Sequence, residues 1–181
     1  MWILVAVIAI ILGFVVLTYN SLVSLRIQAS TAWSDIDVQL KRRHDIVPNL
    51  VATVQGYASH EKSVFEDVAR LRSQAMQLEG AEQSSQTEAQ FTQAIKSLFA
   101  VAESYPELKA DENFRNLQTQ LTEIEDTIQS ARRYYNAVVR DFNIKREVFP
   151  SNLIGDIFHF ARLSYFQIED DECEPVPAKF S

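Results

Sequence analysis

Cysteine and glycine are scarce in this chain of 181 residues. Cys173 is the only cysteine, so the chain cannot form an intrachain disulfide. Of the four glycines, only Gly56, Gly80 and Gly155 lie beyond residue 19. No Asn-Gly or Asp-Gly pair occurs, and these pairs are the strongest local signal for a β-hairpin. The scarcity therefore argues against a fold built from hairpins.

Residues that carry catalysis are also few. A carboxylate-bridged di-metal site in a helical bundle requires Glu-x-x-His on two helices, but none of the three histidines ends such a motif. The nearest string, Asp156 to His159, has no second copy. Cys173 lies among acidic residues 170–174, which disfavour a reactive thiolate. Neither a glycine-rich phosphate loop nor a nucleophile elbow is present. We expect no catalytic residues, no metal and no cofactor.

Positive charge is in deficit. Seventeen Lys and Arg side chains face 24 Asp and Glu side chains, for a net charge of −7 and a pI near 5.0. A nucleic-acid-binding protein normally carries a basic surface. The charge balance therefore argues against nucleic acid as a partner.

The chain begins with its longest apolar run, residues 2–17, which holds no charged residue. As a helix it measures about 24 Å at about 1.5 Å per residue, near the lower limit for crossing a bilayer. A secretory signal is the alternative, but it requires a basic start and a small-x-small cleavage site, and both are missing. The sequence predicts a transmembrane anchor at residues 1–18 that contacts lipid through Trp2, Ile3, Leu4, Val5, Ile8, Ile11, Leu12, Phe14, Val15 and Leu17.

The charges that flank the anchor bear on its orientation. No charged side chain precedes it, whereas Arg26 follows closely and Lys41, Arg42 and Arg43 follow further on. The positive-inside rule then places the remaining domain in the cytoplasm and the short N-terminus outside. The bias depends on one nearby arginine, so the opposite orientation stays open.

Residues 19–147 have the pattern of an all-α, antiparallel helical bundle of the four-helix type. Apolar residues from Phe114 to Phe142 recur at alternating steps of three and four, the a/d seam of a packed or coiled-coil helix. We expect helices near residues 20–45, 47–79, 87–104 and 107–146, with a loop at 79–86. Pro48 is ambiguous. It suits the first turn of a second helix after a tight hairpin, the arrangement that we favour, whereas the unbroken heptad phase across it suits one long helix.

Two further segments are candidates for interactions. Lys41, Arg42 and Arg43 form the densest basic run, which we interpret as a solvated helix end or a contact for protein or anionic ligands. Residues 148–168 are rich in aromatics, include Phe158 and Phe160, and are expected to form a short helix. This segment either packs over the end of the bundle or, if the chain returns to the membrane side, lies against the bilayer. Residues 169–181 form an acidic, proline-containing tail.

Several ordered strings in this sequence are similar to those of the LemA family of bacterial membrane proteins. They are YNSLV at 19–23, AWSDIDVQLKRRHD at 32–45, IVPNLV at 46–51, GYASHE at 56–61, YYN at 134–136 and FPSNLI at 149–154. The resemblance extends from the anchor to about Phe166. It implies an N-terminal anchor and a soluble helical bundle, and it implies no established catalytic residues.

The combined expectation is a single-pass protein of the bacterial inner membrane, a scaffold or adaptor that binds other proteins and has no catalytic activity. Two alternatives stay open: a metal- or ligand-dependent sensor or enzyme built in the bundle, and an organiser of the cell envelope that acts on lipid through the aromatic segment. Self-association through the Phe114 to Phe142 seam is a further use of that surface, although packing within the chain uses it more simply.

Overall fold

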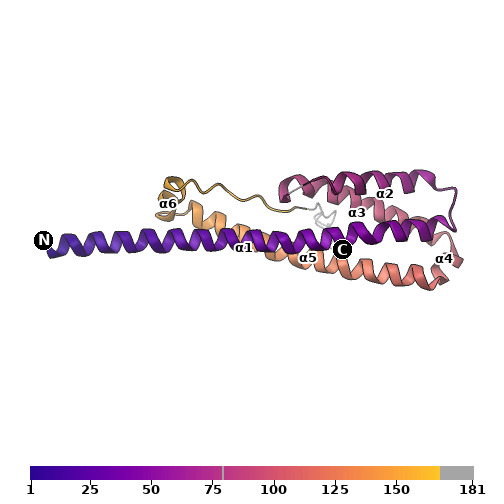
Figure 1. Cartoon of the computed structure of the whole chain (residues 1–181), viewed down its shortest axis with the longest axis horizontal. Coiled ribbons are helices and arrows are strands. Elements are labelled where there is room, and N and C mark those ends of the chain that lie inside the picture. Colours follow the sequence, from indigo (N-terminus) through magenta and orange to yellow (C-terminus); the bar gives the residue numbers. More distant parts are fainter. Residues whose placement is uncertain (79, 168–181) are drawn as a thin grey trace, which may run out of the picture.

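One helix, α1 (Trp2–Gln55), forms the spine of the molecule in a computed structural model that describes residues 1–78 and 80–167. Its 54 residues correspond to about 80 Å. The N-terminal part projects alone, and the rest lies inside the bundle (Figure 1). The described residues contain helices and no strand. The all-α prediction is therefore confirmed.

Our preference for a hairpin at Pro48 was wrong, because α1 continues through this residue to Gln55. A proline inside a helix lacks the N–H that would bond to the carbonyl four residues earlier, here that of His44. The Nε of Arg72 donates to this carbonyl oxygen at 2.6 Å. Arg72 belongs to α2 (Lys62–Ala75), so a neighbouring helix supplies the hydrogen bond that proline removes.

The remaining helices run back and forth beside this spine (Figure 1). After a turn at residues 56–61, α2 runs back toward the predicted anchor at the start of α1 and pairs with α3 (Ala81–Glu103). The short α4 (Pro106–Ala110) leads into α5 (Glu112–Glu147), which lies along α1. The expected loop at 79–86 is mostly wrong, because α3 begins at Ala81. Its N-cap, Gly80, has φ of +85°, a value that glycine adopts without strain.

The core extends along the bundle as three clusters of buried side chains. The cluster far from the anchor includes Val54, Phe91 and Leu98. The middle cluster joins Ile36 on α1 to Ile128 on α5. The cluster nearest the anchor joins Leu22, Phe142 and Phe160. The α5 seam thus packs inside the chain, chiefly against α1.

After α5 the chain folds over the anchor side of the bundle. Residues 148–150 turn into α6 (Ser151–Ile157), which lies close to both α5 and α1. Gly155 allows this approach, because a Cβ there would lie 3.3 Å from the backbone oxygen of Arg146. Residues 158–167 then run without helical structure back along α5 (Figure 1). We call residues 158–167 the strap.

Two asparagines hold the strap to α5. The side-chain amide of Asn143 donates to the carbonyl oxygen of Leu163 at 2.9 Å and accepts from its N–H at 3.0 Å. Asn136 forms the same pair of bonds with Phe166, both at 3.0 Å. Seven helical residues rise about 10.5 Å, and three extended residues span about 10 Å. Asparagines one heptad apart therefore match carbonyls three residues apart. The expected acidic tail with Cys173 lies outside the described residues.

Candidate functional site

Arg43 lies at the centre of the described bundle and connects three helices. Its side chain is fully buried. One terminal nitrogen bonds to Oε2 of Glu88 on α3, and the other donates to Oε1 of Glu125 on α5 at 2.7 Å and to the hydroxyl of Thr92 at 3.0 Å. Its Nε has no hydrogen-bond partner. The guanidinium carbon lies 5.4 Å from the centre of the Phe91 ring, within the range of a cation–π contact.

Glu88 has both carboxylate oxygens engaged. Oε1 lies 3.0 Å from Nε2 of His44, and Oε2 accepts from Arg43. Burial raises the pKa of Glu88, but the hydrogen bond with His44 and the charge of Arg43 outweigh it and lower this pKa below its ordinary value. Arg43, His44, Glu88 and Glu125 form the ionic cluster, in which the first three side chains are buried and Glu125 is half-buried. Through both carboxylate oxygens, Glu88 therefore joins α3 to α1.

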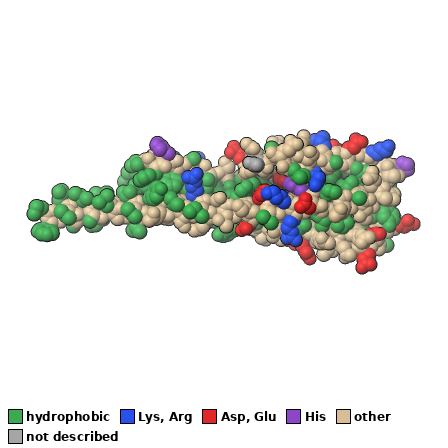
Figure 2. Space-filling model, viewed as in Figure 1, with side chains coloured by type: hydrophobic (Ala, Val, Ile, Leu, Met, Phe, Trp, Pro, Cys, Tyr) green, Lys and Arg blue, Asp and Glu red, His purple; other side chains and the backbone are tan. Residues whose placement is uncertain are grey.

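A cleft of about 630 Å³ opens beside this cluster, between α1 and the connection from α2 to α3. His44 and Glu88 contribute to its lining, together with Trp33, Lys41 and Ser84. Among residues 1–78 and 80–167, no group of three or more His, Cys, Asp or Glu side chains is placed to hold a metal ion. Figure 2 shows basic, acidic and histidine side chains gathered on this face of the bundle.

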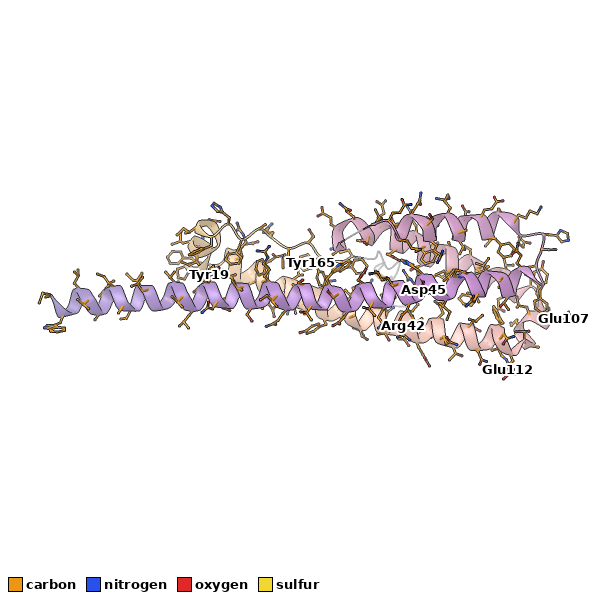
Figure 3. The ribbon with its side chains drawn as sticks, in the orientation of Figure 1. Tyr19, Arg42, Asp45, Glu107, Glu112 and Tyr165 are labelled. Carbon is orange, nitrogen blue, oxygen red and sulfur yellow. The ribbon has the colours of Figure 1, made fainter. Side chains whose placement is uncertain are left out.

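The predicted basic run has two side chains on the solvent-facing side of α1 and one on the side that faces the core. Lys41 is exposed and bonds to Asp37 at 2.6 Å. Arg42 is exposed and donates to Gln39 at 3.2 Å; Figure 3 shows it on α1 near Asp45. Arg43 faces the core. Our interpretation of the whole run as a solvated surface was therefore wrong for Arg43, because residues two positions apart on a helix face different directions.

The two predicted aromatic candidates meet α1 just after the apolar run. The Phe158 ring lies 4.7 Å from that of Tyr19, measured between ring centres, and the Phe160 ring lies 5.8 Å from it. Phe160 is buried against Phe142, whereas Phe158 stays exposed. Figure 3 places Tyr19 beside α6 and Tyr165 further along the strap. The structure thus brings the aromatic segment to the anchor side of the bundle.

The predicted anchor residues project from the bundle. Of positions 2–17, all are exposed except Val15, which is half-buried. One helix among the described residues is long and apolar enough to cross a membrane, and it contains this segment. In Figure 2 the projecting end shows hydrophobic side chains and no charged ones.

Sequence reasoning missed Glu88 and Glu125 as partners of Arg43. A signal for Glu88 was available, since it precedes Phe91, Ile95, Leu98 and Ala102 in the same three-and-four spacing, which puts a carboxylate on the apolar face of α3. Arg43 likewise follows Ile36 and Leu40 in phase. Two opposite charges in phase with apolar stripes are typical of a buried pair. Glu125 lies off its seam, so the sequence carried no comparable signal for it.

The fold defines a class: an elongated helical bundle whose first helix extends beyond it as a bare apolar segment. A comparison with protein families assigns it further. Residues 32–180 match the LemA family model, and the chain belongs to the LemA family. The family prediction is confirmed.

Curated relatives support this assignment. The magnetosome proteins MamQ 1 and MamQ 2 of Paramagnetospirillum magneticum are each 25% identical over 175 residues, covering 82% of this chain and 64% of their own length. The LemA protein of Metamycoplasma hominis is 24% identical over 154 residues, covering 84% of this chain and 70% of its own. The chain thus spans somewhat less than two thirds of the MamQ proteins.

Proposed function

We propose that this protein is a membrane-anchored helical scaffold that binds other proteins and has no catalytic activity of its own. The observation that carries the proposal is the continuity of α1, which passes from an exposed apolar segment into the core of the bundle without a break. Because no flexible linker separates the apolar segment from the bundle, α1 holds the bundle at a set height above the bilayer.

The interior of the bundle supports a structural rather than a catalytic role. The buried carboxylate of Glu88 is neutralised by Arg43 and hydrogen-bonded to His44, so its charge is used to join α3 to α1. The similarity to a magnetosome protein and to a LemA protein is consistent with service in membrane-associated assemblies. The placement of the bundle in the cytoplasm is part of the proposal and follows from Arg26 alone among the near flanking charges.

Photocrosslinking in intact cells tests the adaptor function. A photoreactive amino acid is placed at Val38 or Met76, both exposed, in the full chain. We expect a crosslink to one discrete protein, lost when Ile8 and Leu12 are replaced by Arg to disable the anchor. Crosslinks at neither position, or crosslinks that survive loss of the anchor, contradict the proposal.

Metal analysis of the purified full chain tests the alternative of a sensor or enzyme. A stoichiometric bound ion contradicts a pure scaffold. Alkaline carbonate extraction of cell membranes tests the anchor, because the wild-type chain should stay with the membranes and the Ile8→Arg, Leu12→Arg variant should not.

A further inference from the structure

The anchor side of the bundle carries apolar side chains that no part of the described chain covers. Phe149, Leu153 and Ile157 follow one another at intervals of four, with Phe149 80% and Ile157 66% exposed. Ile144 and Val148 add a second exposed pair at the end of α5. We call these five side chains the α6 apolar face. In the described part of residues 58–143, Met76 and Tyr134 alone among large apolar side chains are comparably exposed.

The α6 apolar face lies at the level where the apolar run of α1 ends. Phe158, which follows α6 directly, has its ring 4.7 Å from that of Tyr19, and Tyr19 comes two residues after Leu17. Thr18 is buried, whereas its neighbours Leu17 and Tyr19 are exposed. The side of α1 that carries Thr18 is therefore covered by the rest of the protein. Figure 1 shows α6 beside α1 at the base of the projecting segment. The face is therefore continuous with the anchor.

The short apolar run strengthens this placement. Sixteen residues measure about 24 Å, whereas the hydrocarbon core of a bilayer is about 30 Å thick. A span that is too short draws its flanking residues toward the hydrocarbon or thins the bilayer. The missing length of about 6 Å is one helical turn, and the next turn is the one that contacts Phe158.

Charge points to the same end of the molecule. Residues 1–31 and 140–167 together carry five basic and three acidic side chains, whereas the rest of the chain carries twelve basic and twenty-one acidic ones. The three acids, Asp141, Glu147 and Asp156, are each paired with an arginine. An end that is net positive in an acidic protein suits the anionic surface of a bacterial membrane.

We propose that the α6 apolar face is a second membrane contact, which inserts into the interface of the bilayer that α1 crosses. Phe149, Leu153 and Ile157 lie among the lipid headgroups and upper acyl chains, while Ile154, Gly155 and Ser151 face the protein. A single helix leaves a bundle free to rotate and tilt, whereas a second contact beside it fixes both. The inference adds to the scaffold function a means of orienting it, and it holds for either orientation of α1.

Depth-dependent quenching in vesicles tests this contact with the full chain. Cys173→Ser removes the native thiol, and a single cysteine at Phe149 or Ile157 carries an environment-sensitive fluorophore. The variants are reconstituted in vesicles of phosphatidylcholine and phosphatidylglycerol with lipids that carry a nitroxide near the headgroup. Met76→Cys, exposed far from α6, is the matched control. We expect most of the emission at positions 149 and 157 to be lost and none at position 76.

Two results would overturn the inference. Emission at positions 149 and 157 that is as unquenched and as red as at position 76 would place the α6 apolar face in water. A blue-shifted emission that lipid nitroxides leave unquenched would place a second copy of the chain, or another protein, on the face. Neither result bears on the scaffold function, which the crosslinking experiment tests at Val38 and Met76.

Discussion

At the scale of single residues, the bundle is defined by polar groups whose partners come from other helices. Arg43 is bonded to two acids on two helices, and the His44 carbonyl that Pro48 leaves free is bonded to Arg72. Both arrangements place strong donors against buried acceptors, and an unpaired acceptor in such a site is costly. They therefore fix the register of α1 against α2, α3 and α5.

Replacing Arg72 tests whether it compensates for Pro48. We expect Arg72→Ala to lower the free energy of unfolding by about 2 kcal/mol, the worth of a hydrogen bond from a charged donor. In a Pro48→Ala chain, residue 48 regains its N–H, and the same change should cost at least about 1 kcal/mol less. Denaturant unfolding of the full chain in detergent, followed by circular dichroism, measures the four variants.

Arg70→Ala is the matched control, because Arg70 is exposed and paired with exposed Asp67 on the same helix. Its removal should cost less than about 0.5 kcal/mol. An equal cost of Arg72→Ala with and without Pro48 would show that the two residues are not coupled.

The ionisation of Glu88 predicts that the stability of the folded chain depends on pH. Its pKa is lower in the folded chain than the ordinary 4.5, so folding favours the ionised form. The resulting stability is fully present above pH 4.5 and is lost as the pH falls through the lowered pKa of the folded state. We expect the thermal midpoint of the wild-type chain to fall steeply in this range.

Glu88→Gln isolates this effect. The variant should be less stable at pH 7 by about 3 kcal/mol, because Arg43 loses a buried partner, and its midpoint should change less with pH below 4.5. Exposed Glu66→Gln is the control and should follow the wild type. Parallel pH curves for Glu88→Gln and wild type would contradict the assignment.

At the scale of elements, the strap is held by side chains instead of a backbone ladder. Its first three residues, 158–160, donate backbone hydrogen bonds to carbonyl oxygens of α6. Beyond them, Asn143 and Asn136 supply both a donor and an acceptor to its backbone. Tyr135 adds a hydroxyl bond to the carbonyl oxygen of Ser164 at 2.8 Å. Such a segment opens locally more easily than a helix does, so its order should depend on individual side chains.

Asn143→Ala removes both bonds to Leu163. We expect the Leu163 amide to lose its protection from hydrogen exchange, while the buried part of α5 keeps its own. Asn143→Asp should retain part of the Leu163 protection, because a carboxylate still accepts from this N–H. Exposed Asn116→Ala serves as the control for loss of an asparagine from α5. Unchanged protection of Leu163 in Asn143→Ala would contradict the role of the side chain.

At the scale of the whole molecule, the unbroken α1 sets the distance between its apolar segment and the far end of the bundle. From Asn20 to Tyr57 the helix and its last turn rise about 55 Å. The bundle adds α2, α3 and α5 around this spine, which stiffens it against bending (Figure 1). The chain is therefore expected to stand out from the bilayer.

Energy transfer to acceptor lipids tests this geometry. In a Cys173→Ser chain reconstituted in vesicles, a donor at Tyr57→Cys should transfer little energy to acceptors at the membrane surface. A donor at Asn20→Cys should transfer most of it. Similar transfer from both positions would show a bundle that lies along the membrane.

The apolar periodicity of this chain determined its helical class and the α5 seam, because the spacing of apolar residues along the chain sets which face of a helix is buried. The continuous apolar run at residues 2–17 determined the first segment. Ordered sequence strings also determined the family. Only the tertiary structure decided the course of the chain at Pro48, because its cost depends on whether Arg72, 24 residues away in sequence, reaches the His44 carbonyl. The pairing of Arg43 with Glu88 and Glu125 was decided in the same way, since a buried charge is stable only where distant partners converge on it.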